Sequence, residues 1–240
     1  MASKTAVVTG AGSGVGQAAA IGLARAGWTV AILGRRESAL AETVAQAGEA
    51  GDQLRPFSCD VGKRDQVRAA AGQIFEQLGP VELLVNSAGN NFKDRYLDDI
   101  TDDNYDGTVD ANMNGAYYCA QAFLSGMRER KSGTVVNVSS DSAFEPNLKA
   151  GVAYIMSKMG MAGLSRSINC EEGPNNIRSC VIYPGEIDTP LLEKRPKMPD
   201  ETRRKQMLTA EDVASTILHV VNLPQRAVIE SIVLRPTIRG

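Results

Sequence analysis

The sequence predicts an α/β fold in which one parallel sheet carries helices on both faces. Short strand-like segments alternate with longer helix-like segments along the whole chain, and this alternation is typical of βα units. The strand-like segments are continuous apolar runs, such as Thr-Ala-Val-Val-Thr at 5–9, which indicates strands that are buried on both sides. The expected strands cover residues 5–9, 28–33, 54–59, 81–85, 134–138, 177–182 and 228–234, and the expected helices cover 17–26, 37–50, 64–78, 101–131, 154–172 and 210–221.

A single domain is expected over residues 1–240. The chain is 43% hydrophobic, and no internal repeat or low-complexity linker divides it, which fits one large α/β domain. Right-handed crossovers between parallel strands then give a doubly wound, Rossmann-type sheet. The polar, basic and proline-containing stretch 189–208 follows a strand, so we expect a mobile loop or helix pair over a site there.

Composition and charge argue against several kinds of partner. The 26 basic and 28 acidic residues nearly balance, whereas nucleic-acid and membrane-surface proteins usually carry a basic excess. No apolar run is long enough to span a membrane, and no signal-peptide pattern precedes the first strand. We therefore expect a cytoplasmic protein that binds neither nucleic acid nor membrane. The basic run between 194 and 205 is interpreted as a solvated face or loop.

No metal site is expected either. The four cysteines are far apart and the chain has one histidine, His219, so the closely spaced ligand set of a zinc site is missing. His219 is expected at or near the surface of the last helix.

A glycine-rich loop lies between the first expected strand and the first expected helix. Residues 9–16 read Thr-Gly-Ala-Gly-Ser-Gly-Val-Gly. Glycine lets the chain turn tightly and lets a phosphate approach the backbone, while the helix N-terminus supplies N–H donors. In the first βα unit such a loop predicts a dinucleotide-binding site. A plain tight turn is the alternative interpretation.

The end of the second strand predicts which dinucleotide binds. Sites for NAD usually place an acidic residue there, which binds the ribose 2′-hydroxyl. Here Arg35 and Arg36 follow the strand, and guanidinium groups recognise phosphate through paired N–H donors. We therefore predict NADP(H), with Arg35 on the 2′-phosphate and Arg36 beside it. Two surface arginines without a ligand are the alternative.

Tyr154 and Lys158 are candidates for proton transfer. Their spacing of four residues places both on one helix face. A neighbouring ammonium favours the phenolate, so Lys158 is expected to lower the pKa of Tyr154. A tyrosine with such a pKa can act as an acid or a base near neutral pH, although the spacing alone is a common coincidence.

Taken in order along the chain, these motifs resemble those of the short-chain dehydrogenase/reductase family, in its shorter type. The resemblance extends from Lys4 to about Pro190. The matching segments are the loop 9–16 (TGxxxGxG), Asp60-Val61, Asn86-Ser87-Ala88-Gly89 (NNAG with serine second), Asn112 on the long central helix, Ser139-Ser140 after the fifth strand, Tyr154 with Lys158 (YxxxK), and Pro184-Gly185 with Thr189-Pro190 (PGxxxTP).

The resemblance implies a role for each catalytic candidate. Tyr154 gives a proton to the substrate oxygen or removes it, and Ser140 hydrogen-bonds that oxygen. Lys158 lowers the tyrosine pKa and binds the nicotinamide ribose, and Asn112 helps to hold a water that relays protons to Lys158. The hydride moves directly between nicotinamide and substrate carbon. The implied cofactor-binding residues are Gly10, Ser13, Gly14, Val15, Gly16, Arg35, Arg36, Asp60, Val61, Asn86, Ala88, Gly89, Tyr154, Lys158, Pro184, Gly185, Ile187 and Thr189.

Some positions depart from the family's pattern. Ser140 precedes Tyr154 by 14 residues, slightly more than is usual in the family, so Ser139 and Ser142 remain lesser candidates for the serine role. Ser13 stands where many NADP-using relatives carry a basic residue, which leaves the 2′-phosphate mainly to the two arginines. Positions that line the substrate cleft in the relatives, or are plain loop residues here, are Phe144, Asn147, Leu148, Glu186, Leu191 and Leu192.

These observations predict an NADP(H)-dependent oxidoreductase that acts on a carbonyl or alcohol group of a small-molecule substrate. One alternative is a dinucleotide-binding regulatory or scaffold protein without turnover, which loss of Tyr154 or Lys158 would favour. Another is a sugar-nucleotide epimerase or dehydratase, for which the chain looks too short. Relatives usually associate through the long helices around Asn112 and Tyr154, so the resemblance implies a homodimer or homotetramer.

Overall fold

A seven-stranded parallel sheet forms the centre of the computed structural model, which describes residues 4–239. The strand order is β3-β2-β1-β4-β5-β6-β7, and every neighbouring pair is parallel. The chain starts in the middle, winds outward to β3, returns to β4 beside β1 and winds outward to β7. This is the doubly wound order that the sequence predicts. The strands are β1 (Lys4–Thr9), β2 (Trp28–Gly34), β3 (Leu54–Ser58), β4 (Leu83–Asn86), β5 (Gly133–Val138), β6 (Ile177–Pro184) and β7 (Ser231–Leu234).

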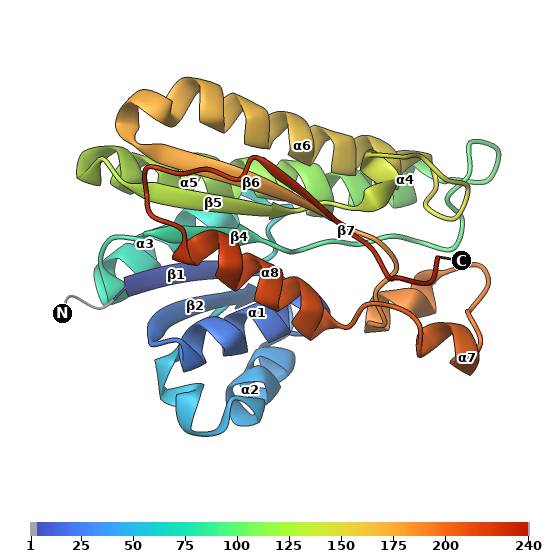
Figure 1. Ribbon diagram of the computed structural model, residues 1–240, viewed down its shortest axis with the longest axis horizontal. Coiled ribbons are helices and arrows are strands. Elements are labelled where there is room, and N and C mark those ends of the chain that lie inside the picture. Colours follow the sequence, from blue (N-terminus) through green and yellow to red (C-terminus); the bar gives the residue numbers. More distant parts are fainter. Residues whose placement is uncertain (1–3, 240) are drawn as a thin grey trace.

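Helices cover both faces of the sheet (Figure 1). One face carries α1, α2 and α8, and the other carries α3, α5 and α6. The bounds are α1 (Gly14–Arg25), α2 (Glu37–Gln46), α3 (Arg64–Leu78), α4 (Asp102–Val109), α5 (Gly115–Arg130), α6 (Val152–Glu172), α7 (Glu201–Arg204) and α8 (Ala210–Asn222), with short 3-10 turns at Gly48–Gln53, Asp141–Ala143, Gly173–Asn175 and Pro190–Lys194.

The apolar runs of the strands fill two cores, one on each face of the sheet. Successive strand residues point to opposite faces. On β1, Val8 packs with Leu23 of α1 and Ile217 of α8, whereas Val7 packs on the other side with Phe123 of α5. All five side chains are fully buried. This two-sided burial explains why the strands read as continuous apolar runs.

Most elements lie within a few residues of the expected bounds, and three differ in a way that has a clear structural reason. The helix expected over 101–131 is interrupted by a π-helical turn (Asp110–Asn114) between α4 and α5. The second helix ends at Gln46, since Gly48 adopts a positive φ of 60°, a conformation that commonly ends helices. The last strand begins at Ser231 rather than at 228, because pairing with β6 starts only at that residue.

The stretch after β6 forms a loop that is closed at its base. Ile187 and Leu208 form an isolated parallel bridge, and the Leu208 amide donates to the Glu186 carbonyl at 2.9 Å. Between them lie the 3-10 turn Pro190–Lys194 and helix α7. These two short helical segments agree with the helix pair that the sequence predicts within 189–208. The loop projects from the edge of the sheet at which the strands end (Figure 1). No helix within residues 4–239 is both long and apolar enough to cross a membrane.

Candidate active site

Two adjoining clefts lie where the parallel strands end. The glycine-loop cleft is formed by the loops after β1, β2 and β4, and the arginine cleft lies beyond it under the loop 187–208. Tyr154, Ser140, Gly185 and Thr189 are among the residues that line both. Ligand sites of open α/β sheets lie at this edge, so the two clefts together are the candidate site.

Gly10 allows the glycine loop to lie directly against the segment that follows β4. Its φ is +67°, and a Cβ at this position would lie 2.7 Å from the Cα of Ala88. The Thr9 hydroxyl accepts hydrogen bonds from the amides of Ser87 and Ala88, both at 3.0 Å. Any larger residue at Gly10 would therefore push the two loops apart.

The N-terminus of α1 is open to the glycine-loop cleft. Ser13 precedes the helix in an extended conformation and makes no capping hydrogen bond through its side chain, and the first turn has no acidic residue. The first amides of a helix lack intrahelical partners and carry partial positive charge. Gly14, Val15 and Gly16 line the cleft at this point, which makes it a place for an anionic group.

Arg35 and Arg36 lie on the rim of the same cleft. Both side chains are exposed and line it next to Gly34, at the end of β2. Within residues 4–239, neither guanidinium is in an ion pair with a carboxylate. Their donors are therefore available to a ligand.

All of the predicted cofactor-binding residues line the glycine-loop cleft except Asn86. Asn86 is 2% exposed. Its side-chain amide donates to Asn137 Oδ1 at 2.9 Å and to the Ala116 carbonyl at 3.4 Å. The prediction for Asn86 therefore needs correction, because its side chain ties β4 to β5 and α5 beneath the cleft.

Ser140 and Tyr154 meet at the junction of the two clefts. Ser140 follows β5, and its hydroxyl acts on the Tyr154 phenol, whose pKa it lowers, and accepts a hydrogen bond from the Ser142 amide at 3.2 Å. The two lesser serine candidates have other partners: Ser139 donates to the Lys158 carbonyl at 2.8 Å, and Ser142 accepts from Asn147 at 3.0 Å. The geometry thus favours Ser140 for the serine role.

The phenol of Tyr154 holds its proton strongly. Burial raises its pKa above the ordinary value of 10.0, and the nearby Asp141 carboxylate raises the pKa further. The hydrogen bond with Ser140 and the guanidinium groups of Arg195 and Arg95 oppose these effects without cancelling them. Tyr154 is therefore a neutral hydroxyl at physiological pH.

Lys158 lies one helical turn beyond Tyr154 and is 4% exposed. Its Nζ donates to the Val138 carbonyl at 2.9 Å and lies 5.7 Å from the centre of the Tyr154 ring. Burial lowers the pKa of Lys158 from 10.5 to about 8. The net shift of the Tyr154 pKa is upward, because the desolvation of the phenol outweighs the attraction of charged neighbours, and the lowering of this pKa by Lys158 stays a prediction.

Asn112 lies in the π-helical turn and is fully buried. Its Oδ1 accepts from the Asn90 amide at 2.6 Å, and its Nδ2 donates to the Asn90 carbonyl at 3.1 Å and to Ser157 Oγ at 3.0 Å. The side chain lines neither cleft. Asn112 therefore acts in this structure as a positioning residue for the loop after β4, and π-helical turns often occur at such functional positions.

The arginine cleft has a volume of about 400 Å³ and an ionic lining that the sequence analysis missed. Asn147, Glu186, Leu191 and Leu192 line it as expected, but Phe144 and Leu148 do not. Phe144 packs on the ring of Tyr183, and Leu148 is 87% exposed. The charged lining residues are Arg95, Lys149, Arg195, Arg203, Arg235 and Arg239, with Asp141, Glu145 and Glu186.

The basic run between 194 and 205 is only partly a solvated face. The side chains of Arg195 and Arg203 are 22% and 17% exposed and both bind Glu186, whereas Lys205 is 74% exposed. The interpretation as a solvated loop is thus wrong for Arg195 and Arg203. The position of the run, directly after the PGxxxTP segment, is the one sequence signal that could have placed it at the site.

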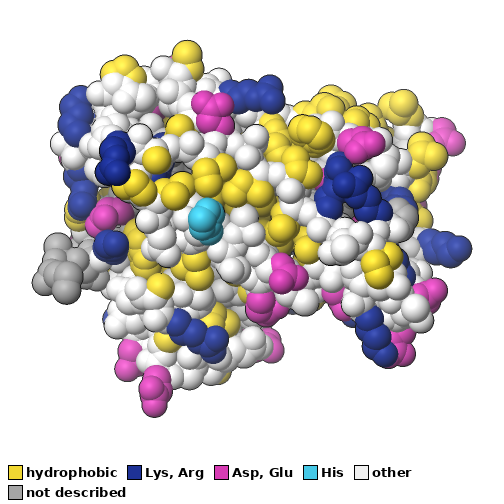
Figure 2. Space-filling view, in the orientation of Figure 1, with side chains coloured by type: hydrophobic (Ala, Val, Ile, Leu, Met, Phe, Trp, Pro, Cys, Tyr) yellow, Lys and Arg dark blue, Asp and Glu magenta, His cyan; other side chains and the backbone are white. Residues whose placement is uncertain are grey.

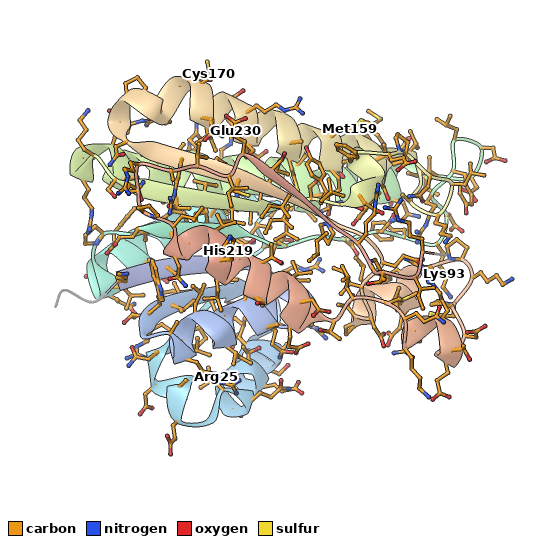
Figure 3. All side chains as sticks on the ribbon, viewed as in Figure 1. Arg25, Lys93, Met159, Cys170, His219 and Glu230 are labelled. Atoms are coloured by element: carbon orange, nitrogen blue, oxygen red, sulfur yellow. The ribbon has the colours of Figure 1, made fainter. Side chains whose placement is uncertain are left out.

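His219 takes no part in either cleft. It lies exposed on α8, away from the loop that carries α7 (Figure 3), as the sequence predicts. In the described part of the chain, no three His, Cys, Asp or Glu side chains gather in a way that could hold a metal ion.

A doubly wound sheet with a glycine-rich first loop and a Ser–Tyr–Lys set at its edge defines a dinucleotide-binding enzyme fold. Residues 4–200 match the short chain dehydrogenase family. The chain belongs to this family of oxidoreductases.

Relatives cover nearly the whole chain. A 3beta-hydroxysteroid dehydrogenase of Mediterraneibacter gnavus is 31% identical over 256 aligned positions, which cover 96% of this chain and 92% of the relative. Among solved structures, a closed form of serine dehydrogenase with NADP+ has a TM-score of 0.88 at 25% identity and covers 98% of this chain and 96% of its own. A metagenomic short-chain oxidoreductase with NADP has a TM-score of 0.84 at 26% identity and covers 99% of both chains.

Proposed function

We propose that this chain is an NADP(H)-dependent oxidoreductase that transfers a hydride between the nicotinamide and the carbon of a carbonyl or alcohol group, with Tyr154 as the acid or base. The position of Ser140 and Tyr154 together at the junction of the two clefts, with Lys158 one helical turn beyond, is the observation that carries the proposal. One cleft has the character of a dinucleotide site, and the other leaves room for a small substrate. A reaction between the two ligands takes place where the clefts meet.

The residues of the glycine-loop cleft fit a dinucleotide. The uncapped N-terminus of α1 offers free amides to a pyrophosphate. A Cβ at Gly14 would meet Thr189 at 3.3 Å, so the absence of a side chain keeps the cleft open between the loop and the segment after β6. Asp60 and Val61 line the end of the cleft beside Arg35 and Arg36, where the adenosine half would lie.

The preference for NADP(H) rests on Arg35 and Arg36. The two positions directly after β2 hold arginines and no carboxylate that could bind a ribose 2′-hydroxyl, and both guanidinium groups form no ion pair among the described residues. A 2′-phosphate would give them a partner. The serine dehydrogenase and the metagenomic oxidoreductase were both crystallised with NADP, which supports the same preference.

When bound, the nicotinamide supplies or accepts the hydride. In reduction, the Tyr154 hydroxyl gives its proton to the substrate oxygen, and Ser140 donates a hydrogen bond to the same oxygen. In oxidation, Tyr154 accepts the proton from the alcohol. Lys158, with a pKa of about 8, exchanges protons readily near neutral pH, and its Nζ lies 5.7 Å from the centre of the Tyr154 ring.

Replacement of Tyr154 tests this proposal. Tyr154→Phe should remove nearly all turnover of NADPH with a panel of aldehydes, ketones and hydroxy acids, while NADPH binding by calorimetry stays close to that of the wild type. Retained turnover in the variant would refute the role of Tyr154. A wild type that binds NADPH but turns over no member of the panel would favour a regulatory dinucleotide-binding protein instead.

A further inference from the structure

The arginine cleft carries an excess of positive charge that hydride transfer does not use. Six basic and three acidic side chains line it, although the whole chain has a net charge of −2. Figure 2 shows a group of basic side chains on the side of the molecule that holds α7 and the C-terminus. A local excess of one sign in a concave site concentrates ligands of the opposite sign.

Glu186 compensates only part of this charge. Its Oε1 accepts from Arg195 at 2.8 Å and from Lys149 at 3.4 Å, and its Oε2 accepts from Arg203 at 2.9 Å. Burial alone would raise the pKa of Glu186, but the hydrogen bonds from Arg203 and Arg195 hold that pKa at about 2. One ionised carboxylate thus binds three cations and can neutralise only one of their three positive charges.

Arg95 adds a buried cation that forms no ion pair within residues 4–239. It is 3% exposed, and its guanidinium donates to the backbone carbonyls of Phe92 at 2.6 Å, of Lys149 at 3.0 Å, and of Lys194. Carbonyl dipoles satisfy its N–H groups but leave its charge uncancelled. A buried charge of this kind is costly unless an opposite charge comes near.

The three carboxylates of the cleft are all bound by its cations. Arg235 is paired with Asp141 at 3.4 Å and with Glu145 at 2.9 Å, and Glu186 binds Arg195, Arg203 and Lys149. Arg95 and Arg195 both act electrostatically on the Tyr154 phenol. Among the described residues, Nη1 is the one side-chain atom of Arg195 with a hydrogen-bond partner, so the rest of its guanidinium is free to bind a ligand.

These cations are not placed to bind the dinucleotide phosphates. The glycine loop, the N-terminus of α1 and the two arginines after β2 all belong to the other cleft, and neither Arg95 nor Arg195 lines it. An anion bound at Arg195 would therefore belong to the second ligand, the substrate.

We propose that the substrate carries an oxyanion, a carboxylate or a phosphate, close to its reacting carbonyl or alcohol group, and that Arg195 binds this oxyanion while Arg95 and Lys149 supply background charge. The inference rests on the proposed function, because it assigns the substrate class of the same site. A cleft of about 400 Å³ suits a small metabolite of this kind.

Matched substrate pairs test the inference. The pairs are acetoacetate with methyl acetoacetate, and dihydroxyacetone phosphate with dihydroxyacetone, each with NADPH. For at least one pair the wild type should prefer the charged member in kcat/KM, and Arg195→Gln should reduce that preference on the order of 10- to 100-fold, as expected for the loss of a hydrogen bond to a charged group. Turnover of the neutral members should fall much less than turnover of the charged members.

Two further variants separate charge from folding. Arg195→Lys keeps the charge and should restore part of the preference. Arg25→Gln removes an exposed arginine of α1 on the far side of the molecule (Figure 3) and should behave like the wild type. A phosphate preference without a carboxylate preference, or the reverse, identifies which oxyanion the site takes.

Binding measurements distinguish a failure of the inference from a failure of the proposed function. Calorimetry with acetoacetate and with inorganic phosphate, in the presence of NADP+, should show binding to the wild type that Arg195→Gln weakens, whether or not turnover occurs. If neutral members react as well as charged ones, the inference is wrong and the oxidoreductase proposal stands. If neither anion binds the wild type more tightly than Arg195→Gln, and no charged member is preferred, the inference is overturned.

Discussion

Lys158→Met should stabilise the folded protein at neutral pH while it damages the active site. The lysine is 4% exposed, and its pKa of about 8 lies well below the ordinary 10.5. Its charged form is therefore less favourable in the folded protein than in the unfolded chain. Methionine has a similar length and no charge to desolvate.

The burial of the charge sets the size of this effect. One pKa unit corresponds to about 1.4 kcal/mol, so the Lys158 charge costs about 3 kcal/mol of folding free energy at about pH 7. Methionine would lose the hydrogen bond to the Val138 carbonyl, which is 2.9 Å long and contributes about 1 kcal/mol. The net gain expected for Lys158→Met is about 2 kcal/mol at about pH 7.

The sign of the pH dependence makes the prediction specific. Between the folded pKa of about 8 and the unfolded value of 10.5, the unfolded chain binds a proton that the folded protein has released. The wild type therefore gains stability as pH rises through this window. The advantage of Lys158→Met should shrink accordingly and reverse above the upper value, where only the lost hydrogen bond remains.

Guanidinium chloride unfolding of both proteins at about pH 7 and at about pH 10 measures the difference in unfolding free energy. Lys93→Met is the matched control, since Lys93 is exposed and its replacement should give no comparable pH dependence. A stability difference between wild type and Lys158→Met that is the same at both pH values would refute the reasoning.

Four further outcomes follow from the same structure. The double replacement of Arg35 and Arg36 by Gln should lower the preference for NADPH over NADH in kcat/KM on the order of 10- to 100-fold. An unchanged ratio of the two kcat/KM values would show that these residues do not bind the 2′-phosphate. Because the Tyr154 pKa is raised above 10.0, the rate of reduction should be steady from about pH 6 to about pH 8 whereas oxidation accelerates as pH rises, and a pH–rate profile with the opposite slopes would contradict the assignment. Arg178 is 7% exposed and donates to Thr134 and to five backbone carbonyls around the end of α8, so Arg178→Met should lower the free energy of unfolding by about 3 kcal/mol or more, as chemical denaturation can measure. Met159 is 43% exposed on α6, and if the long helices form the expected symmetric interface, Met159→Glu should reduce the mass seen by light scattering, whereas an unchanged multimer would place the interface elsewhere.

Most of the fold could be predicted from local sequence patterns, because strands that are buried on both faces of the sheet have continuous apolar sequences. The strands around β1 could be predicted for this reason. The π-helical turn at Asp110–Asn114 could not, because it depends on contacts of Asn112 with Asn90 and Ser157 that lie far away along the chain. Helical periodicity contains no information about such contacts.

The two clefts differ in the same way. The residues of the glycine-loop cleft come from short motifs at strand ends, so their spacing alone indicates their positions. The arginine cleft instead combines Arg95, Lys149 and the loop 187–208, which carries Arg195 and Arg203. Only the chain topology brings these cations into one cleft, and a charge run by itself is indistinguishable from an ordinary solvated loop.

The Tyr154 pKa shows most clearly what spacing leaves out. A lysine four residues away predicts electrostatic attraction and a lowered pKa, but the net shift is upward because burial of the phenol is the larger effect. The cations that oppose this effect are Arg195 and Arg95, which also form the proposed anion site. An oxyanion bound there would offset their positive charge and raise the Tyr154 pKa further. A bound anionic ketone would thus keep the proton on Tyr154 until hydride transfer gives the substrate oxygen enough charge to take it.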